Sequence, residues 1–134
     1  TYRLSQMIEH KKHWLTGVPE PKKYVLIPIF DAQGNLVAGR KYLLPQYRGE
    51  KDAKIKFAWS QSPVTLYPAA ALKHDTLVLA EGEWDALLLN QHNIPAITTT
   101  GGAGYDLSKL AAQIKDKSIY ICYDSRRACC KKHS

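Results

Sequence analysis

The segment from Thr76 to Gly104, TLVLAEGEWDALLLNQHNIPAITTTGGAG, constrains the fold of this chain most strongly. It begins with an apolar run that ends abruptly in Glu81-Gly82-Glu83-Trp84-Asp85, and a helical pattern and a second apolar run follow. The predicted elements are a strand over 76–80, a helix over 84–92, a strand over 96–99, a glycine-rich loop over 101–104, a helix over 107–114 and a strand over 119–123. This βαβαβ order implies parallel strands joined by right-handed crossovers.

Acidic residues follow two of the predicted strands. Glu81 ends the first, with Asp85 four residues on, and Asp124 ends the third. Ligands of open α/β sheets bind beyond the carboxyl ends of the strands, so these carboxylates converge if the three strands are neighbours. Placing carboxylates at the end of a buried strand costs free energy unless a partner compensates their charge. A divalent metal ion is such a partner, and carboxylate oxygen atoms are suitable ligands for Mg²⁺ or Mn²⁺. We therefore expect a metal site for phosphoryl transfer, beside Gly101 and Gly102, whose backbone N–H groups can approach a phosphate.

Each of these residues also has a purely structural interpretation. Asp85 suits the first turn of a helix, where the macrodipole favours a carboxylate. The glycines at 101 and 102 suit a helix-entry turn, and Asp124 suits a turn after a strand. The shared edge and the order of the features favour the functional interpretation.

The first 75 residues follow a different pattern. Apolar residues recur at helical spacing from Leu4 to Leu15, which predicts a helix over 2–15. The runs 24–30 and 36–44 flank a turn-forming sequence and predict a β-hairpin. We expect a basic loop over 45–56, a short strand over 57–59 and a helical turn over 68–73. The predicted fold class is α/β, with a mixed α+β N-terminal half before the parallel sheet and its flanking helices.

The charge of the chain is unevenly distributed. Its net charge is +7. Residues 1–75 contain 12 Lys and Arg against 6 Asp and Glu, residues 76–124 contain 3 against 6, and residues 125–134 contain 4 against none. A basic lobe beside an acidic one suits a polyanion held next to a cation-binding pocket. A generally basic surface without a specific partner is the alternative.

The remaining composition is that of an ordinary globular protein, with 45% hydrophobic and 23% charged residues. No apolar run approaches the roughly 20 residues of a membrane span, and no signal-peptide pattern is present, so we expect a cytoplasmic protein with no membrane partner. The three cysteines form no zinc-type cluster, so no zinc is expected in this chain. Cys122 is expected to be buried in a strand.

These motifs resemble a known family. The second half of the chain contains a strand, then Glu81-Gly82-Glu83-x-Asp85-Ala86, a helix, Thr-Gly-Gly and a strand ending in Asp124. This arrangement is similar to the Toprim domain of DNA primases, topoisomerases, and some nucleases and recombination proteins. Upstream, VLIPIFDAQGNLVAGRKYLL resembles the hairpin of the basic subdomain that precedes Toprim in bacterial and phage primases. KFAWSQSPVTLYPAAAL resembles the lysine–aromatic, Ser-Pro-x-Thr and Leu-Tyr segments of that subdomain. The resemblance covers residues 24–124.

The resemblance implies a primase catalytic core that synthesises RNA primers on single-stranded DNA with magnesium. It implies a basic subdomain over 1–74 and a Toprim domain over 75–124, followed by a basic tail over 125–134 that we expect to be disordered. Glu81 would be the acid/base or metal-associated glutamate, and Asp85 would support the metal site. Asp124 would be the first aspartate of the Asp-x-Asp motif that binds magnesium.

The resemblance also implies the partners of the chain: single-stranded DNA, nucleotides and a replicative helicase. The residues assigned to template or nucleotide binding are Arg40 and Lys56, by their match to the basic subdomain, and Lys41 and Lys54, by adjacency. Solvated surface charge is the alternative for these cations. Trp59 and Tyr67 suit base stacking, although aromatic residues in short strands more often belong to a core.

The sequence departs from the family at one ligand position. Asp124-Ser125-Arg126 stands where the family has Asp-x-Asp, so a cation replaces the second acidic ligand. A Toprim domain also continues past this point, so we expect the domain to be incomplete at its C terminus. These departures favour one alternative to an active primase, an inactive Toprim nucleic-acid-binding protein or fragment. Two further alternatives are a Toprim-type nuclease and a basic α/β domain without a site. The upstream hairpin and Ser-Pro-x-Thr segment disfavour the nuclease.

Overall fold

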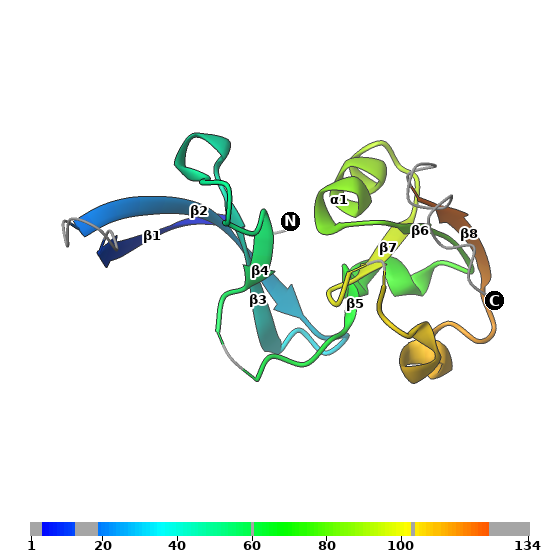
Figure 1. The fold of residues 1–134 in the computed structure, drawn as a ribbon. Helices are drawn as coiled ribbons and strands as arrows, with labels where there is room; N and C mark the ends of the chain where they lie inside the picture. Colours follow the sequence, from blue (N-terminus) through cyan, green and yellow to red (C-terminus); the bar gives the residue numbers. More distant parts are fainter. Residues whose placement is uncertain (1–3, 13–18, 60, 103, 124–134) are drawn as a thin grey trace. The chain divides into compact units, whose positions relative to one another are not determined.

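The described residues form two four-stranded sheets (Figure 1). The structure is a computed structural model, and it describes residues 4–12, 19–59, 61–102 and 104–123. Contacts divide the chain into two units, which we call unit 1 (residues 1–29 and 35–63) and unit 2 (residues 30–34 and 64–134). One sheet is antiparallel in its described strand pairs and the other contains parallel strands, so the predicted α/β class is confirmed.

The first sheet has the strand order β1-β2-β3-β4. Its strands are β1 (Ser5–Lys12), β2 (Pro19–Phe30), β3 (Leu36–Leu43) and β4 (Ile55–Phe57), with the short 3₁₀ helix η1 (Pro45–Tyr47) between the last two. The predicted hairpin is confirmed by the neighbouring strands β2 and β3. In its turn, Gly34 has a φ of +86° and its N–H donates to the Asp31 carbonyl at 3.1 Å. This left-handed conformation explains a glycine at that position.

The helix predicted over 2–15 is wrong, because residues 5–12 form β1. The strand pairs with β2 in an antiparallel register from Ser5 opposite Leu26 to Lys12 opposite Pro19. The strand period leaves Leu4 and Ile8 exposed, at 45% and 48%, and partly covers Met7. The helical spacing had placed all three on one face. A continuous ladder with β2 outweighs this short amphipathic pattern, because isolated helices of this length are marginal in water.

A salt-bridged aspartate holds the loop between η1 and β4. The Asp52 carboxylate accepts hydrogen bonds from the Gly49 N–H at 2.8 Å and from Lys22 Nζ at 2.9 Å. The backbone N–H of Gly49, followed by Lys22, holds the pKa of Asp52 below its usual range. A carboxyl whose pKa is lower in the folded state stabilises the fold above its ordinary pKa of about 4, and this contribution is lost as the pH falls further.

We therefore expect Asp52→Asn to lower the free energy of unfolding at pH 7, and to do so less at pH 3. The expected loss at pH 7 is below about 1 kcal/mol, since the ion pair is open to solvent. Urea unfolding of both proteins at the two pH values measures the difference. An equal loss at both values would contradict the assignment.

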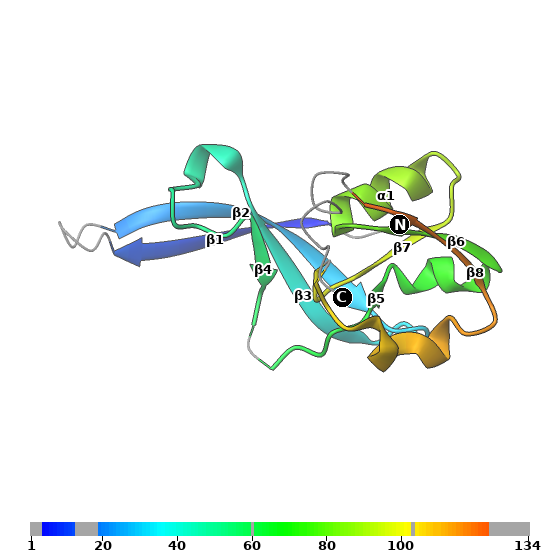
Figure 2. The same ribbon diagram turned by 45° about the vertical axis from the view of Figure 1, so that its right-hand side comes forward.

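The second sheet has the strand order β5-β7-β6-β8 (Figure 2). Its elements in chain order are β5 (Leu66–Tyr67), η2 (Ala69–Lys73), β6 (Thr76–Ala80), α1 (Glu83–Gln91), β7 (Ala96–Thr99), η3 (Leu107–Gln113) and β8 (Ser118–Cys122). Strand β6 runs parallel to both β7 and β8, while β5 is antiparallel to β7. The predicted parallel strands are confirmed. The helix predicted over 107–114 is the 3₁₀ helix η3.

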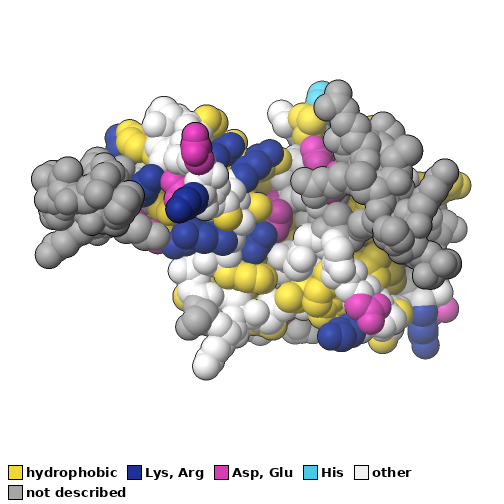
Figure 3. All heavy atoms as spheres, in the orientation of Figure 1, with side chains coloured by type: hydrophobic (Ala, Val, Ile, Leu, Met, Phe, Trp, Pro, Cys, Tyr) yellow, Lys and Arg dark blue, Asp and Glu magenta, His cyan; other side chains and the backbone are white. Residues whose placement is uncertain are grey.

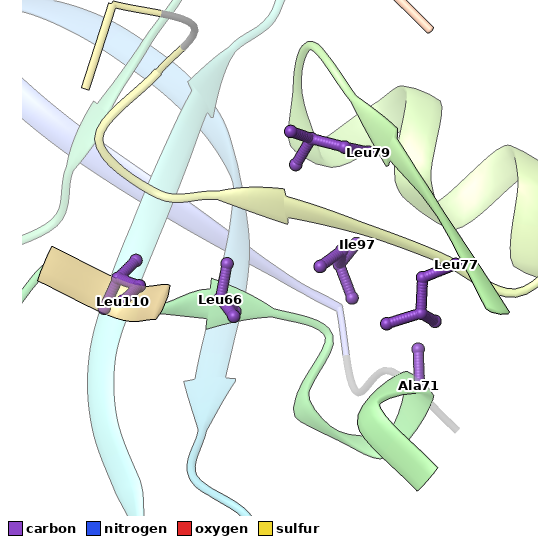
Figure 4. Packing of buried hydrophobic residues seen from close by; sticks show 6 residues of the cluster. All are labelled: Leu66, Ala71, Leu77, Leu79, Ile97 and Leu110. Carbon is purple, nitrogen blue, oxygen red and sulfur yellow. The ribbon is translucent and has the colours of Figure 1, made fainter. Parts of the chain in front are cut away.

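Apolar side chains cover both faces of this sheet. On the face that meets η2 and η3, six buried residues form one cluster (Figure 4): Leu66, Ala71, Leu77, Leu79, Ile97 and Leu110. On the face that meets α1, Ala80 packs with Ala86 and Ala96. Successive residues of β6 thus alternate between two cores, which explains its continuous apolar sequence. None of the helices in the described ranges combines the length and the apolar character that crossing a membrane requires.

Strand β8 is the least covered strand of this sheet. It stands at the end of the strand order in the described part of the chain, with Tyr120 and Ile121 exposed at 65% and 69%. Cys122 is a free and exposed thiol, so its predicted burial is wrong. The apolar sequence of β8 had suggested a fully covered strand, but its position at the edge leaves much of it accessible. The predicted basic tail over 125–134 lies outside the described residues.

Candidate active site at the end of the central strand

The carboxyl end of β6 lies in the middle of the parallel strands of unit 2. The register places Leu79 opposite Ile97 on β7, and Ala80 opposite Cys122 on β8. Glu81 follows β6 directly and is partly exposed. The three strands are therefore neighbours, which is the condition that the predicted site requires, and their carboxyl ends share one edge of the sheet.

Tyr123 is a further residue at this edge of the sheet. Tyr123 follows β8, one step beyond the Ala80–Cys122 pair, and packs partly buried against the apolar cluster of unit 2. Burial raises the pKa of its phenol, and the negative charge of Glu81 raises it further. The sequence interpretation missed Tyr123, although its place directly before Asp124 was a usable signal.

The first turn of α1 carries two further carboxylates. Gly82 is the N-cap residue, and Glu83 and Asp85 lie in the first turn. Glu83 is buried, with 4% of its surface exposed, whereas Asp85 is exposed. Both positions are favourable for an acidic residue because of the helix macrodipole. The structural interpretation of Asp85 thus agrees with its position, and its role in a metal site stays a prediction.

The threonines at the end of β7 are buried and hydrogen-bonded. Thr100 donates its N–H to the Thr65 carbonyl at 2.9 Å, and the Thr65 N–H donates to Thr100 Oγ1 at 3.0 Å. These bonds continue the β5–β7 pairing past the strand ends. They fix the chain at the point where it leaves the sheet for the glycine loop.

The two glycines after these threonines are required by the turn itself. A Cβ on Gly101 would lie 2.7 Å from the Tyr105 ring and 2.9 Å from Val64, and Gly102 has a φ of +83°. The Gly101 N–H donates to Thr99 Oγ1 at 3.1 Å, and the Gly102 N–H donates to the Thr99 carbonyl at 3.2 Å. Both N–H groups are thus engaged within the turn, and the proposed phosphate contact of these glycines stays a prediction.

Two of the three predicted metal ligands, Glu81 and Asp85, lie within the described residues. Among the residues that the structure describes, no group of three His, Cys, Asp or Glu side chains is placed to hold a metal ion. The predicted ligand Asp124, and Arg126 beside it, lie outside those residues. The described oxygen donors at the edge come from Glu81 and Asp85, which are chemically suited to a hard cation. Mg²⁺ or Mn²⁺ at this edge therefore stays a prediction that depends on Asp124.

Two of the predicted nucleic-acid contacts lie within the covered part of unit 1. Arg40 and Lys41 on β3 are each only 8% exposed. The Arg40 guanidinium lies 4.4 Å from the centroid of the Phe57 ring. Lys41 Nζ forms an ion pair with Glu9 and lies 5.0 Å from the centroid of the Tyr24 ring. In this structure both cations thus make contacts that link strands of the sheet.

The other two predicted cations are more accessible. Lys54 is exposed, with its Nζ 6.0 Å from the centroid of the Tyr42 ring. Lys56 is partly buried and lies opposite Lys41 in the β3–β4 pair. The sequence interpretation did not select Arg48, whose guanidinium lies 5.4 Å from the same Tyr42 ring. Figure 3 shows Lys and Arg side chains gathered on one face of unit 1.

Comparison with known proteins identifies the fold. No family model matches the chain, and no curated protein sequence does. A DNA primase domain from Pseudomonas aeruginosa superposes with a TM-score of 0.62 at 23% identity, over 89% of this chain and 40% of that one. The DnaG primase catalytic domain bound to single-stranded DNA superposes with a TM-score of 0.58 at 23% identity, over 78% of this chain and 35% of that one. The fold is that of a bacterial primase catalytic core.

A third primase structure supports this assignment. The RNA polymerase domain of Mycobacterium tuberculosis DnaG, in complex with a double-stranded DNA oligomer with a 6-nucleotide overhang, superposes with a TM-score of 0.52 at 19% identity. The match covers 87% of this chain and 40% of that one. The chain therefore spans less than half the length of these primase structures. The predicted resemblance to primase cores is confirmed at the level of the fold.

Proposed function

We propose that this chain is part of a DNA primase catalytic core and contributes to magnesium-dependent synthesis of RNA primers on a single-stranded DNA template. The observation that carries the proposal is the position of Glu81, at the carboxyl end of the central parallel strand of a primase-type fold. Two of the similar primase structures hold DNA, which supports a nucleic-acid template for this chain.

In this proposal, Glu81, Asp85 and Asp124 would hold the metal. The ion would neutralise phosphate charge and acidify the attacking hydroxyl when bound. Glu81 would accept a proton or orient the cation. The buried threonines at the end of β7 would keep the neighbouring loop rigid.

The template would be held by the cations of unit 1. Lys54 and Lys56 are accessible enough for phosphate contacts, whereas Arg40 and Lys41 would act mainly by supporting the sheet. Binding through such contacts weakens as the salt concentration rises. Ribonucleotides are the second proposed ligand. A primase role would also place the chain in the cytoplasm, with a replicative helicase as a further partner.

One sequence feature favours a second candidate function. Arg126 replaces an acidic metal ligand of the family, which removes one negative charge and adds a positive one. A Toprim nucleic-acid-binding protein without catalysis would keep the template contacts of unit 1 and lose primer synthesis.

Primer synthesis on circular single-stranded DNA with labelled ribonucleotides separates the two candidates. We expect short RNA products with Mg²⁺ and none with EDTA. Restoring the carboxylate with Arg126→Asp should raise the yield by about tenfold or more, since even residues that only support metal ligands change metal affinity or activity by about 10- to 100-fold. DNA binding without products, in both proteins, would favour the non-catalytic candidate. Absence of both DNA binding and products would refute the proposal.

A further inference from the structure

An exposed tryptophan on unit 1 is held in place by a glycine. Trp59 follows β4 and is 44% exposed. A Cβ on Gly39 of β3 would lie 2.6 Å from its Cζ3 and 2.7 Å from its Cη2, so the six-membered ring lies directly against the Gly39 backbone. The Ala58 N–H donates to the Gly39 carbonyl at 2.8 Å, and Ser62 Oγ donates to the Trp59 carbonyl at 2.8 Å. The indole is thus anchored at one end while much of its surface stays accessible.

Gly39 is required by the position of the Trp59 ring and not by the conformation of its own backbone. The described glycines with positive φ are Gly34 and Gly102, and Gly39 lies in a regular part of β3. Any side chain at position 39 would push the indole away. Tyr67, the other aromatic residue considered for base stacking, is only 3% exposed and belongs to the core of unit 2. The expectation that aromatic residues in short strands belong to a core is therefore supported for Tyr67. For Trp59 it is contradicted by the exposure of the side chain.

A partly exposed cation, Lys56, lies on the same face of the sheet as the indole. Side chains two residues apart on a strand point to the same face, so Lys41 lies on the face of Gly39, although it is buried and paired with Glu9. Lys56 lies opposite Lys41 on this face and is partly exposed. Unit 1 contains 11 Lys and Arg against 4 Asp and Glu. An accessible aromatic ring beside a surplus of cations is the arrangement with which proteins bind single-stranded nucleic acids, by stacking on bases and attracting phosphates.

We propose that Trp59 is a stacking platform for one nucleobase of single-stranded DNA, seated on Gly39. This inference rests on the proposed function, because it takes unit 1 to be the template-binding surface. The competing interpretation is that the indole only covers a glycine in a strand, as aromatic residues do in many sheets. The two interpretations differ in whether the contribution of Trp59 requires the bases of the ligand.

The test compares a twelve-residue oligothymidylate with an abasic oligomer of the same length and phosphate content. Affinities are measured by fluorescence anisotropy for the wild type, Trp59→Ala, Trp59→Phe and Gly39→Ala. We expect Trp59→Ala to weaken oligothymidylate binding by about 5- to 150-fold, since stacking contributes about 1–3 kcal/mol per base. Binding of the abasic oligomer should be unchanged. Trp59→Phe should keep most of the affinity, since it keeps an aromatic ring.

Gly39→Ala provides the sharpest comparison, because it leaves the indole in the protein and displaces it from its seat. It should weaken oligothymidylate binding in the same direction as Trp59→Ala, with thermal unfolding showing that both variants remain folded. Equal affinities of the wild type and Trp59→Ala for oligothymidylate would overturn the stacking role and leave the proposed function standing. Equal losses for both oligomers would also overturn it. If the wild type binds neither oligomer, the template-binding proposal fails as well.

Discussion

Glu81→Gln is expected to reduce primer synthesis by about 100- to 10,000-fold, the range that a positioned acid or base contributes. The amide keeps the size of the side chain at the end of β6, so the fold should be retained. It can neither accept a proton nor attract a cation with a full charge. The measurement is the initial rate of RNA product formation over a range of Mg²⁺ concentrations. A rate that recovers at high Mg²⁺ would assign Glu81 to metal binding, whereas a rate that stays low would assign it to proton transfer.

Asp75→Asn is the matched control for this variant. Asp75 directly precedes β6, so it lies at the opposite end of the same strand, and its side chain is exposed. Its backbone carbonyl accepts a hydrogen bond from the Ser118 N–H at 2.9 Å, which the substitution retains. Primer synthesis by Asp75→Asn should match the wild type. An equal loss in both variants would show that removing any carboxylate of unit 2 impairs the protein, and would refute a specific role of Glu81.

The strands β6 and β7 of unit 2 were predictable from the sequence because they are buried on both faces. Strands of this kind have continuous apolar sequences with abrupt polar ends. Residues 76–80 and 96–99 form strands with the predicted bounds. The position of the candidate site followed from the same pattern, since the order of the elements determines which strand ends meet. The edge strand β8, with its exposed apolar residues, shows that an apolar sequence alone does not establish burial.

Unit 1 was harder to predict because its structure depends on distant partners. Lys41 is buried and forms an ion pair with Glu9, which lies 32 residues away in the sequence. No local pattern signals this pair, so Lys41 was interpreted as a phosphate contact. The strand β1 likewise forms because β2 is available to pair with it. The contact of the Trp59 ring with Gly39 was not predictable either, because it depends on β3 and β4 placing Gly39 beside Ala58.

Ile97→Ala is expected to lower the free energy of unfolding by about 2–5 kcal/mol, the range for truncating a large aliphatic side chain in a packed core. Ile97 lies on β7, between β5 and β6, and is fully buried. It belongs to the cluster with Leu66 and Leu77, and the loss of its branched chain would leave a cavity there. Domains of this size are stable by only about 5–15 kcal/mol, so this one substitution should remove a large part of the total.

Ile94→Ala offers the same chemical change three residues earlier, at a side chain that is 43% exposed. The Ile94 N–H donates to the Leu89 carbonyl at 2.9 Å, and the substitution leaves this bond in place. We expect a loss below about 1 kcal/mol, since truncating an exposed side chain creates no buried cavity. Urea unfolding followed by circular dichroism measures both variants, and their slopes should agree if the unfolded states are alike. Similar losses at positions 94 and 97 would contradict the core that unites β5, β6 and β7, and with it the support beneath Glu81.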